Sequence, residues 1–412
     1  MRYREIKLTD KLKDLPKEAI WMHKHPELGV EPISTKSCLD PEFFERERDE
    51  VFRKRWLCVG QMLELPEKGT FFVKDLPGLK ASIIIVRDRS DQVRAFHNVC
   101  CHRGNKVEWE KAGKCRSFTC KFHGWSYKLD GSLADVPDED RFYDFDKKNH
   151  GLIPIHVGTW LGFVFINLAD EPEETLDEEL GEFKEMLSDF PMGDFTKVYS
   201  YKADLACNWK VELDAQMEGY HAPQLHGHSA ARAFSDMDTP TFHALDFKMF
   251  KRHRTMTAPM SPHDVTPVEA VATKFGGSMW LSQDDANVGL NLDNFPNFGF
   301  DLYSFFPNFQ FILTANAIGI YWYWPTSHNT MVYEARFMFR HPKNAGERFA
   351  QEFNVCGALR DVQMEDMITV EATQLALESG VITEYLLQDE EILLRHAYHV
   401  LHNDVPLEKV KG

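Results

Sequence analysis

The chain has no long apolar run and no excess of positive charge. No stretch of about 18 or more consecutive apolar residues occurs in its 412 residues, so we expect no membrane-spanning helix and no membrane partner. It has 64 acidic and 47 basic residues, and its formal net charge is −17. Because binding to phosphate backbones needs a basic surface, this balance argues against nucleic acid as a partner.

Cysteine is scarce and does not follow the spacing of a disulfide-rich fold. The eight cysteines are dispersed, which is typical of a reducing compartment. The segment Met1–Lys7 carries charges without an apolar run behind them, so we predict no signal peptide and a cytoplasmic location. Cys38, Cys58, Cys207 and Cys356 stand alone and are expected to be small, buried apolar side chains.

Two other cysteines each stand close to a histidine. Cys100 and His102 form a C-x-H pair, and Cys120 and His123 form a C-x-x-H pair after seventeen further residues. Two thiolates and two imidazoles are the ligands of a Rieske [2Fe–2S] cluster, in which the cysteines hold one iron and the histidines hold the other. A structural zinc site is the alternative, but such sites usually pair cysteine with cysteine and histidine with histidine. The spacing therefore favours the cluster.

Short apolar runs separated by turn residues fill the chain from Trp56 to about Leu168. Runs of this kind predict a small antiparallel β domain, and each Cys/His pair follows one of them. We therefore expect the two pairs at the tips of two loops. The segment Thr175–Glu178 has the pattern of a capping box and predicts a helix that continues to about Leu187.

The chain divides into three parts on these patterns. Residues 1–40 are predicted to be an N-terminal segment that packs on the last domain, residues 41–168 the domain with the Cys/His pairs, and residues 169–412 a second domain. Apolar spacing predicts helices near 41–52, 208–225, 344–379 and 386–402, and strands over 199–206, 309–320, 321–325 and 330–340.

A pair of histidines in the second domain is a candidate metal site. His221 and His226 are separated by a segment that contains Pro223, so they can converge if a helix ends or bulges there. With a carboxylate from elsewhere they would form the facial triad of non-haem iron(II) oxygenases, which leaves positions open for dioxygen and substrate. Because the chain has 18 histidines, the pair alone does not distinguish iron ligands from surface or core histidines.

The motifs together are similar to those of a known enzyme family. The chain resembles the catalytic α subunit of Rieske non-haem iron ring-hydroxylating oxygenases, in order along the chain from about residue 40 to about residue 380. The resemblance implies an α+β fold, with a small antiparallel β Rieske domain and a catalytic domain whose antiparallel sheet wraps around a long helix. The matching segments are Cys100–Gly104, Cys120–Trp125, Asn208–Lys210, Glu218–His221 with His226, and Phe306–Asn308.

The resemblance also implies roles for the ligand residues. Cys100, His102, Cys120 and His123 would hold the [2Fe–2S] cluster, and His221 and His226 would hold a mononuclear Fe(II). The family's third iron ligand is an aspartate on a late helix, often followed eight residues later by glutamine. Asp366 has Gln374 in that place, and Asp361 is the alternative.

Two further residues are candidates for a catalytic role. In many members an aspartate three residues before the first iron histidine links it to the second cluster histidine of a neighbouring subunit. Glu218 stands at that position and would bridge His221 and His123 between two chains. Asn208, in the Asn-Trp-Lys motif, is the other candidate.

The implied function is that of an oxygenase terminal component. The cluster would pass electrons to the iron, which would activate O2 for mono- or cis-dihydroxylation of an aromatic or other hydrophobic substrate, as in aromatic hydrocarbon catabolism. Phe295–Phe300 and Tyr303–Phe306 supply aromatic side chains that suit such a substrate. A monooxygenase or demethylase acting on a methylated quaternary amine is the alternative, and an electron-transfer protein without oxygenase activity is a more distant one.

The partners follow from the same resemblance. The chain has no G-x-G-x-x-G fingerprint, so electrons from NAD(P)H are expected to come through a separate reductase and possibly a ferredoxin. We expect a homo-oligomer, a trimer or an assembly with a small β subunit.

Overall fold

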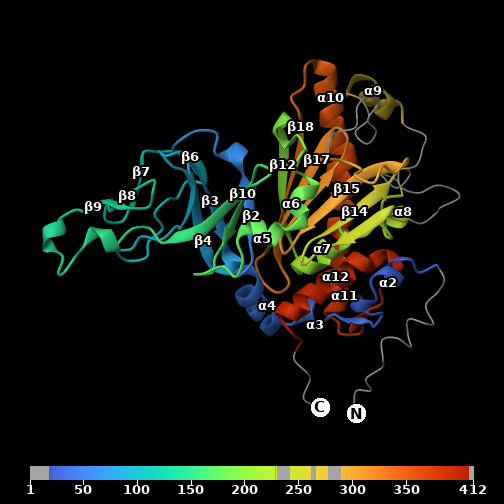
Figure 1. The fold of residues 1–412 in the computed structure, drawn as a ribbon, viewed down its shortest axis with the longest axis horizontal. Helices are drawn as coiled ribbons and strands as arrows, with labels where there is room; N and C mark the ends of the chain where they lie inside the picture. The colour runs from blue at the N-terminus through green and yellow to red at the C-terminus, as the bar shows by residue number, and fades with distance from the viewer. Residues whose placement is uncertain (1–17, 228, 230–241, 261–265, 277–288, 408–412) are drawn as a thin grey trace, which may run out of the picture. The chain divides into compact units, whose positions relative to one another are not determined.

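The computed structural model describes residues 18–227, 229, 242–260, 266–276 and 289–407 (Figure 1). They form two compact units, one of residues 48–184 and one that combines the first 47 residues with residues 185–412. The predicted boundaries at residues 40/41 and 168/169 remain predictions.

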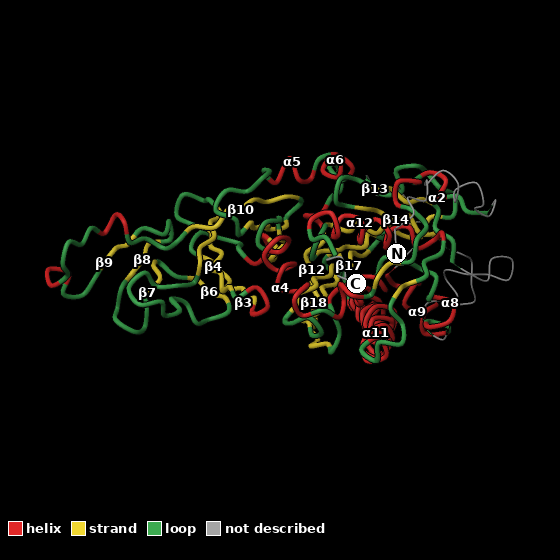
Figure 2. The backbone as a smooth tube through the Cα atoms, turned by 90° about the horizontal axis from the view of Figure 1, so that it is seen from below, coloured by secondary structure: helices red, strands yellow, loops and turns green. Residues whose placement is uncertain are grey.

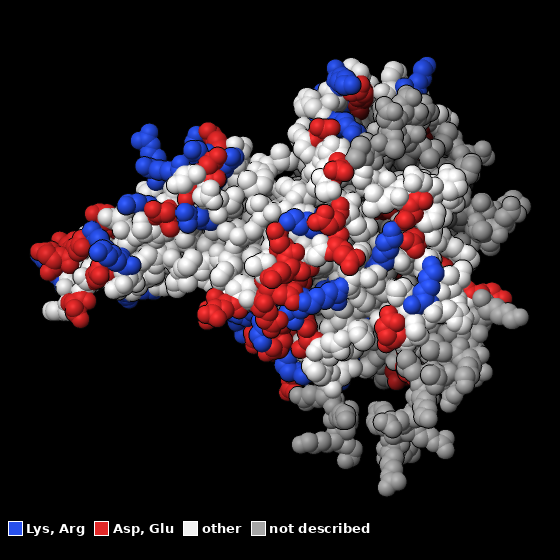
Figure 3. All heavy atoms as spheres, viewed as in Figure 1, with Lys and Arg blue, Asp and Glu red and all other residues white. Residues whose placement is uncertain are grey.

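Within the described ranges, no helix is both long enough and apolar enough to cross a membrane. On the face drawn in Figure 3, acidic and basic side chains are interspersed and form no continuous basic surface.

The unit of residues 48–184 consists of two antiparallel sheets. The larger sheet has the strand order β2-β11-β10-β5-β4-β3-β6. Its strands are β2 (Leu57–Gln61), β3 (Thr70–Leu76), β4 (Ala81–Arg87), β5 (Val93–His97), β6 (Ala112–Lys114), β10 (Pro154–Trp160) and β11 (Phe163–Asn167). The smaller sheet is formed by β7 (Ser117–Thr119), β8 (Ser126–Lys128) and β9 (Leu133–Asp135). The predicted small antiparallel β domain is confirmed.

The core of this unit is apolar and reaches the loops with the Cys/His pairs. Ile84, Phe96 and Phe118 are buried in one cluster with both cysteines of the pairs, Cys100 and Cys120. Because the strands that precede the two loops are anchored in that cluster, the loops start from fixed points.

The capping box at Thr175 is present, but the helix that it opens is shorter than predicted. Helix α5 (Leu176–Leu180) ends at Gly181, whose φ of 49° is a left-handed conformation that favours glycine. A second short helix, α6 (Glu182–Met186), follows.

The second unit is built on an antiparallel sheet with the order β12-β18-β17-β16-β15-β14-β13. Its strands are β12 (Phe195–Leu205), β13 (Asp246–Met249), β14 (Arg254–Pro259), β15 (Phe298–Phe305), β16 (Phe309–Leu313), β17 (Ala317–Pro325) and β18 (Met331–Arg340). The single strand predicted over residues 309–320 is wrong. The chain turns between β16 and β17, where Thr314 hydrogen bonds to Ala317 through both its amide and its hydroxyl group.

Helices pack in layers on this sheet. Helix α7 (Trp209–Ala215) contacts β17, and α11 (Asp361–Leu377) contacts α7. Figure 2 shows α11 nearly end-on beside the strands. The other described helices of this unit are α2 (Trp21–Lys24), α3 (Lys36–Leu39), α4 (Pro41–Glu47), α8 (Ala222–Leu225), α9 (Pro267–Gly276), α10 (Ala345–Phe353) and α12 (Ile392–Asp404). The predicted α+β class, with an antiparallel sheet packed on a long helix, is confirmed.

Two of the predicted helices are interrupted. The segment 208–225 is not one helix, because α7 ends at Ala215 and α8 begins only at Ala222, next to Pro223. The segment 344–379 contains a π-helical stretch, Asn354–Arg360, between α10 and α11. Of the four lone cysteines, Cys356 lies in this stretch and is exposed, so its predicted burial is wrong, whereas the other three are buried.

A buried ion pair fixes α4 to α7. Lys210 Nζ lies 2.7 Å from Glu47 Oε1, and Trp209 Nε1 donates to Glu47 Oε2 at 2.8 Å. Both charged side chains are almost fully buried. Burial raises the pKa of Glu47, although Lys210 and Trp209 oppose the increase. The carboxylate therefore depends on these two partners.

Removing one member of this pair tests its contribution. Lys210→Met should lower the free energy of unfolding by about 3–5 kcal/mol, because it leaves the Glu47 carboxyl group buried without a counter-ion. The double variant Glu47→Gln, Lys210→Met retains an acceptor for Trp209 and should recover most of the loss in denaturant unfolding. If both variants are equally destabilised, the buried charge is not the cause.

Candidate metal centre

Two loops with the same backbone conformation carry the Cys/His pairs. They follow β5 and β7, and each begins with a cysteine, Cys100 or Cys120. In both loops the cysteine amide donates to the carbonyl five residues later at 2.8 Å, and a glycine amide four residues later donates back to the cysteine carbonyl at 2.9 Å. The two glycines, Gly104 and Gly124, have φ values of 76° and 77°, a left-handed conformation that disfavours other residues. The predicted loop tips are therefore two copies of one turn.

The side chains of the two loops meet. The imidazole rings of His102 and His123 have centroids 4.5 Å apart, and the His102 ring stacks on Trp125 at 5.0 Å. The thiols of Cys100 and Cys120 are buried and interact with each other. Burial raises the pKa of Cys120, but hydrogen bonds from backbone N–H groups of its own loop and from the side chains of Asn105 and Cys100 outweigh that effect and lower the pKa below its usual value.

This donor set fits an iron–sulfur cluster. The His102 Nδ1 atom is buried and makes no hydrogen bond within the described residues, so it is free to bind a metal. Two sulfurs and two adjacent imidazoles, held by backbone hydrogen bonds, are the ligands that a [2Fe–2S] cluster of the Rieske type requires.

Tyr127 contacts the sulfur ligands from the core. Its hydroxyl group lies 3.2 Å from Cys100 Sγ and accepts a hydrogen bond from the Cys101 amide at 3.1 Å. Since burial keeps the pKa of Tyr127 far above its usual value, the hydroxyl group retains its proton and can donate to the sulfur. Tyr127 was not predicted from the sequence, although it stands only two residues after Trp125, the last residue of the second motif.

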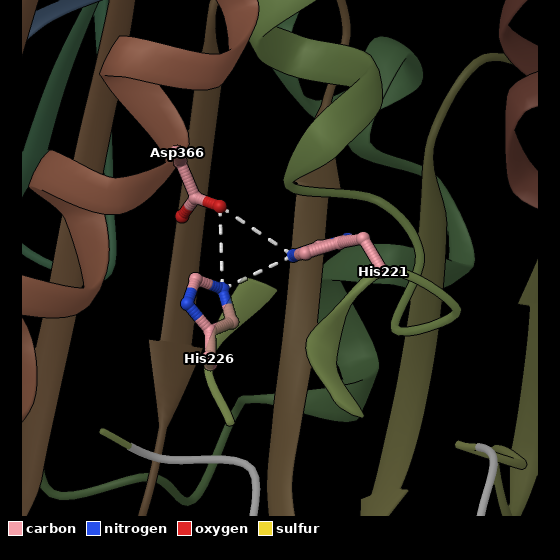
Figure 4. Close-up of side chains that lie close together, drawn as sticks. All are labelled: His221, His226 and Asp366. Atoms are coloured by element: carbon pink, nitrogen blue, oxygen red, sulfur yellow. Dashed lines mark hydrogen bonds and ion pairs between the residues drawn. The ribbon is translucent and has the colours of Figure 1, made fainter. Parts of the chain in front are cut away.

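Three predicted metal ligands converge in the second unit (Figure 4). The Nε2 atoms of His221 and His226 lie 3.2 Å apart, and Asp366 Oδ1 lies 3.5 Å from the first and 3.2 Å from the second. All three ligand atoms are within 4.8 Å of one another. Asp366 is 2% exposed, and its Oδ1 atom makes no hydrogen bond among the described residues. One carboxylate and two imidazoles turned toward a common point fit a mononuclear iron.

The break in the predicted helix places the two histidines. His221 precedes the short helix α8, which has Pro223 in its first turn, and His226 follows it. The single helical turn between them brings both imidazoles to the same side, opposite Asp366 on α11 (Figure 4).

A carboxylate orients each imidazole. Glu218 Oε1 lies 2.5 Å from His221 Nδ1, and Glu365 Oε2 lies 2.7 Å from His226 Nδ1. When Nδ1–H donates to a carboxylate, Nε2 is left as the free lone pair for a metal. Burial would lower the pKa of each histidine, but the surrounding carboxylates outweigh it and raise the pKa. The site therefore attracts a cation.

Glu365 was not predicted. Its partner His226 lies 139 residues away, so the sequence around Glu365 does not indicate the contact. The only signal in the sequence is that Glu365 directly precedes the predicted ligand Asp366. Glu218 was predicted as a bridge between subunits; its contact with His221 is present, and the bridge to His123 of another chain remains a prediction.

The two remaining candidates lie apart from the converging ligands. Asp361 is half exposed and pairs with its neighbour Arg360 at 2.6 Å. Asn208 caps α7, because its side-chain Oδ1 accepts from the Lys210 backbone N–H at 2.9 Å. The backbone N–H of Asn208 donates to Gln374 Oε1 at 3.0 Å. These are the contacts of a helix cap, and a catalytic role for Asn208 remains a prediction.

Two cavities adjoin the converging ligands. Both are lined by Glu218, His221 and Asp366. The larger cavity, of about 240 Å³, is also lined by Asp214 and Glu391. Burial raises the pKa of Asp214 to about 7. No lysine or arginine is among the described residues that line either cavity.

The smaller cavity, of about 110 Å³, has an apolar wall. Met256, Leu302 and Ile312 lie in one cross-strand row over β14, β15 and β16 and line it together. Of the aromatic segments proposed from sequence to form such a wall, only Phe300 lines the cavity, and Tyr303, Phe305 and Phe306 are core residues.

Comparison with protein families identifies both units. Residues 55–154 match a family model described as the Rieske [2Fe–2S] domain. Residues 192–405, more than half of the chain, match the model described as the ring hydroxylating alpha subunit, catalytic domain. The chain belongs to the ring-hydroxylating alpha-subunit family.

As a ring-hydroxylating alpha subunit, the chain combines a Rieske [2Fe–2S] domain with a mononuclear iron catalytic domain. The family and the two cofactors predicted from the sequence are confirmed, and the Rieske match favours the cluster over the alternative of zinc.

Individual relatives support the same family. The chain is 35% identical over 188 residues to the carnitine monooxygenase oxygenase subunit of Acinetobacter pittii (strain PHEA-2), over 45% of this chain and 50% of that protein. It is 35% identical over 187 residues to the glycine betaine monooxygenase oxygenase subunit of Pseudomonas aeruginosa (strain UCBPP-PA14), over 45% and 43%. The chain thus spans about half the length of these curated relatives.

A solved structure has the same fold. The crystal structure of a quaternary ammonium Rieske monooxygenase in complex with an inhibitor superposes with a TM-score of 0.72 at 22% identity. The match covers 90% of this chain and 95% of that one.

The two aspartates of the late helix give a matched test of the third ligand. Asp366→Ala should remove most of the mononuclear iron, because it deletes the buried oxygen that faces both imidazoles. Asp361→Ala should retain the iron of the unmodified protein, since that side chain is half exposed. Iron analysis, with the cluster counted separately from its visible absorption, checks the ranking, and the reverse ranking would move the ligand to Asp361.

The Tyr127 hydroxyl group should tune the cluster. Tyr127→Phe should retain the cluster spectrum but lower its reduction potential, because a hydrogen bond to sulfur stabilises the more negative reduced state. For a bond worth about 1 kcal/mol, the shift is about 40 mV. Redox titration checks it, and an unchanged potential would contradict donation from Tyr127.

Proposed function

We propose that the chain is the terminal component of a Rieske oxygenase that hydroxylates a small hydrophobic substrate with O2. The observation that carries this proposal is the convergence of His221, His226 and Asp366 beside a cavity with an apolar wall. Three protein ligands on one side leave the other positions of an iron open. When bound, the mononuclear iron supplies activation of dioxygen, and the cluster supplies single electrons.

The surrounding residues hold the ligands and shape the site. Glu218 and Glu365 hold the Nδ1 atoms of the two histidines and so keep both Nε2 atoms directed at one point. The row of apolar side chains on β14 to β16 excludes water from the side where a substrate would bind.

Electrons would come from NAD(P)H through a separate reductase, with or without a ferredoxin, since the chain has no dinucleotide fingerprint. The same proposal includes a homo-oligomer, a trimer in its simplest form, in which Glu218 links His221 to His123 of a neighbouring chain. Glu218 supports this role because it contacts His221 and lines the larger cavity, of about 240 Å³.

The described cavity wall favours an uncharged aromatic or other hydrophobic substrate. Beside the ligands, the smaller cavity is lined mainly by apolar and aromatic side chains, including Phe242, Met256, Phe300 and Leu302. A substrate carboxylate would find no lysine or arginine among the described residues there, and burying it unpaired would be costly.

A methylated ammonium substrate is the second candidate. Phe242, Phe300 and Tyr321 line the same cavity as the carboxylates of Glu218 and Asp366, and aromatic faces beside carboxylates bind quaternary ammonium groups. The two curated relatives, whose names give carnitine and glycine betaine as substrates, support this candidate.

A substrate panel separates the two candidates. The reconstituted protein, with a reductase and NADH, is incubated with small aromatic hydrocarbons, with trimethylalkylammonium ions, and with the same ions bearing a carboxylate. We expect hydroxylated or cis-diol products from the aromatic compounds by mass spectrometry, whereas release of formaldehyde from the ammonium ions would instead establish the demethylase. The His221→Ala variant is the control, and it should lose turnover while its cluster spectrum stays unchanged.

A further inference from the structure

A chain of hydrogen bonds leads from strand β18 of the sheet to the metal ligand Asp366. Tyr333, which is fully buried on β18, donates its hydroxyl proton to Gln363 Oε1 on α11. Gln363 Nε2 donates to Gln216 Oε1 at 3.3 Å, and Gln216 Nε2 donates to Asp366 Oδ2 at 3.1 Å. Gln216 follows directly after α7, so the chain of bonds connects the sheet with both helices of the site.

The direction of these bonds is fixed from both ends. A carboxylate that binds a cation carries no proton and can only accept, so the side of Gln216 that faces Asp366 must be the NH2 group. At the other end, burial keeps the pKa of Tyr333 well above its usual value, so its hydroxyl group retains the proton that it donates. The orientation of both amide groups therefore follows from their surroundings.

The two oxygens of Asp366 have different partners as a result. Oδ2 receives the Gln216 N–H, whereas Oδ1 has no hydrogen-bond donor in the described part of the chain and faces the Nε2 atoms of His221 and His226. In Figure 4 the second oxygen is turned away from His221. A donor on Oδ2 opposes the rotation that would bring both oxygens to one metal, because the rotation would break that bond.

We propose that Gln216, supported by Gln363 and Tyr333, is a positioning residue that keeps Asp366 bound to iron through Oδ1 alone. Binding through one oxygen keeps one more coordination position open for dioxygen beside the two imidazoles. This inference rests on the proposed function, because it assumes iron at this site. Neither helix holds this arrangement alone, since Gln216 belongs to the end of α7 and Asp366 to α11.

The experiment measures the iron site without turnover. The full-length protein carrying its oxidised cluster is loaded with Fe(II) at the mononuclear site and then with nitric oxide, which makes that iron visible to electron paramagnetic resonance. Gln216→Leu removes the N–H and nearly conserves volume. We expect an altered nitrosyl signal at full iron occupancy, at least tenfold weaker nitric oxide binding, and a dissociation constant for Fe(II) about 10- to 100-fold higher. Gln363→Leu leaves Gln216 in place and should change the signal in the same direction but less.

Gln374→Leu is the matched control. Gln374 is a buried glutamine of α11, the helix that also carries Gln363 and Asp366, but its partners are the Asn208 backbone N–H and Glu378. It should give the nitrosyl signal and Fe(II) affinity of the unmodified protein. The proposal is overturned if Gln216→Leu retains the unmodified signal at full occupancy, or if Gln374→Leu changes it equally. If the unmodified protein binds no Fe(II) at His221, His226 and Asp366, the proposed function itself fails, which is a different result.

Discussion

The packing of α11 against α7 is the constraint on which the metal centre depends. The two histidines flank α8, the next helix after α7, whereas Asp366 comes from α11, far along the chain. Their ligand atoms are brought together because α7 and α11 are in contact. Each ligand is then fixed by a second group, Glu218, Glu365 or Gln216, so that position and orientation are determined separately. The ligand geometry is therefore preorganised before a metal ion binds.

The two metal sites reach rigidity by different means. The cluster loops rely on local backbone hydrogen bonds, repeated in both loops, and on a core that includes the ligand sulfurs themselves. Two of the three iron ligands, His226 and Asp366, rely on side-chain contacts between remote elements, whereas the contact of His221 with Glu218 is local. Consequently, the first site is encoded in two short motifs, and the second is spread over the whole catalytic unit.

This difference explains how much the sequence could predict. Spacing alone identified the four cluster residues as candidates, because their geometry is local. The choice between Asp361 and Asp366 stayed open, because five residues on a helix rotate the side chain by about 140°, and only packing decides which face is inward. Glu365 and Gln216 could not be found, because their partners His226 and Asp366 lie about 140 to 150 residues away in the sequence. Pro223 indicated in the sequence that the helix is interrupted near α8. That both imidazoles then lie on the same side could be seen only in the folded structure.

The cross-strand row that forms the wall of the smaller cavity continues past Ile312 to Gly319 on β17. A side chain at Gly319 would come within 2.5 Å of the Tyr321 hydroxyl oxygen, so Tyr321 closes the row. These positions carry none of the metal ligands, and they lie on strands whose backbones are held by hydrogen bonds to the neighbouring strands. Single substitutions along the row can therefore enlarge or fill the cavity at one strand at a time without changing the metal ligands. A lineage with this architecture can diverge in substrate range through a few codons that lie far apart in the gene but encode side chains that are neighbours in the sheet.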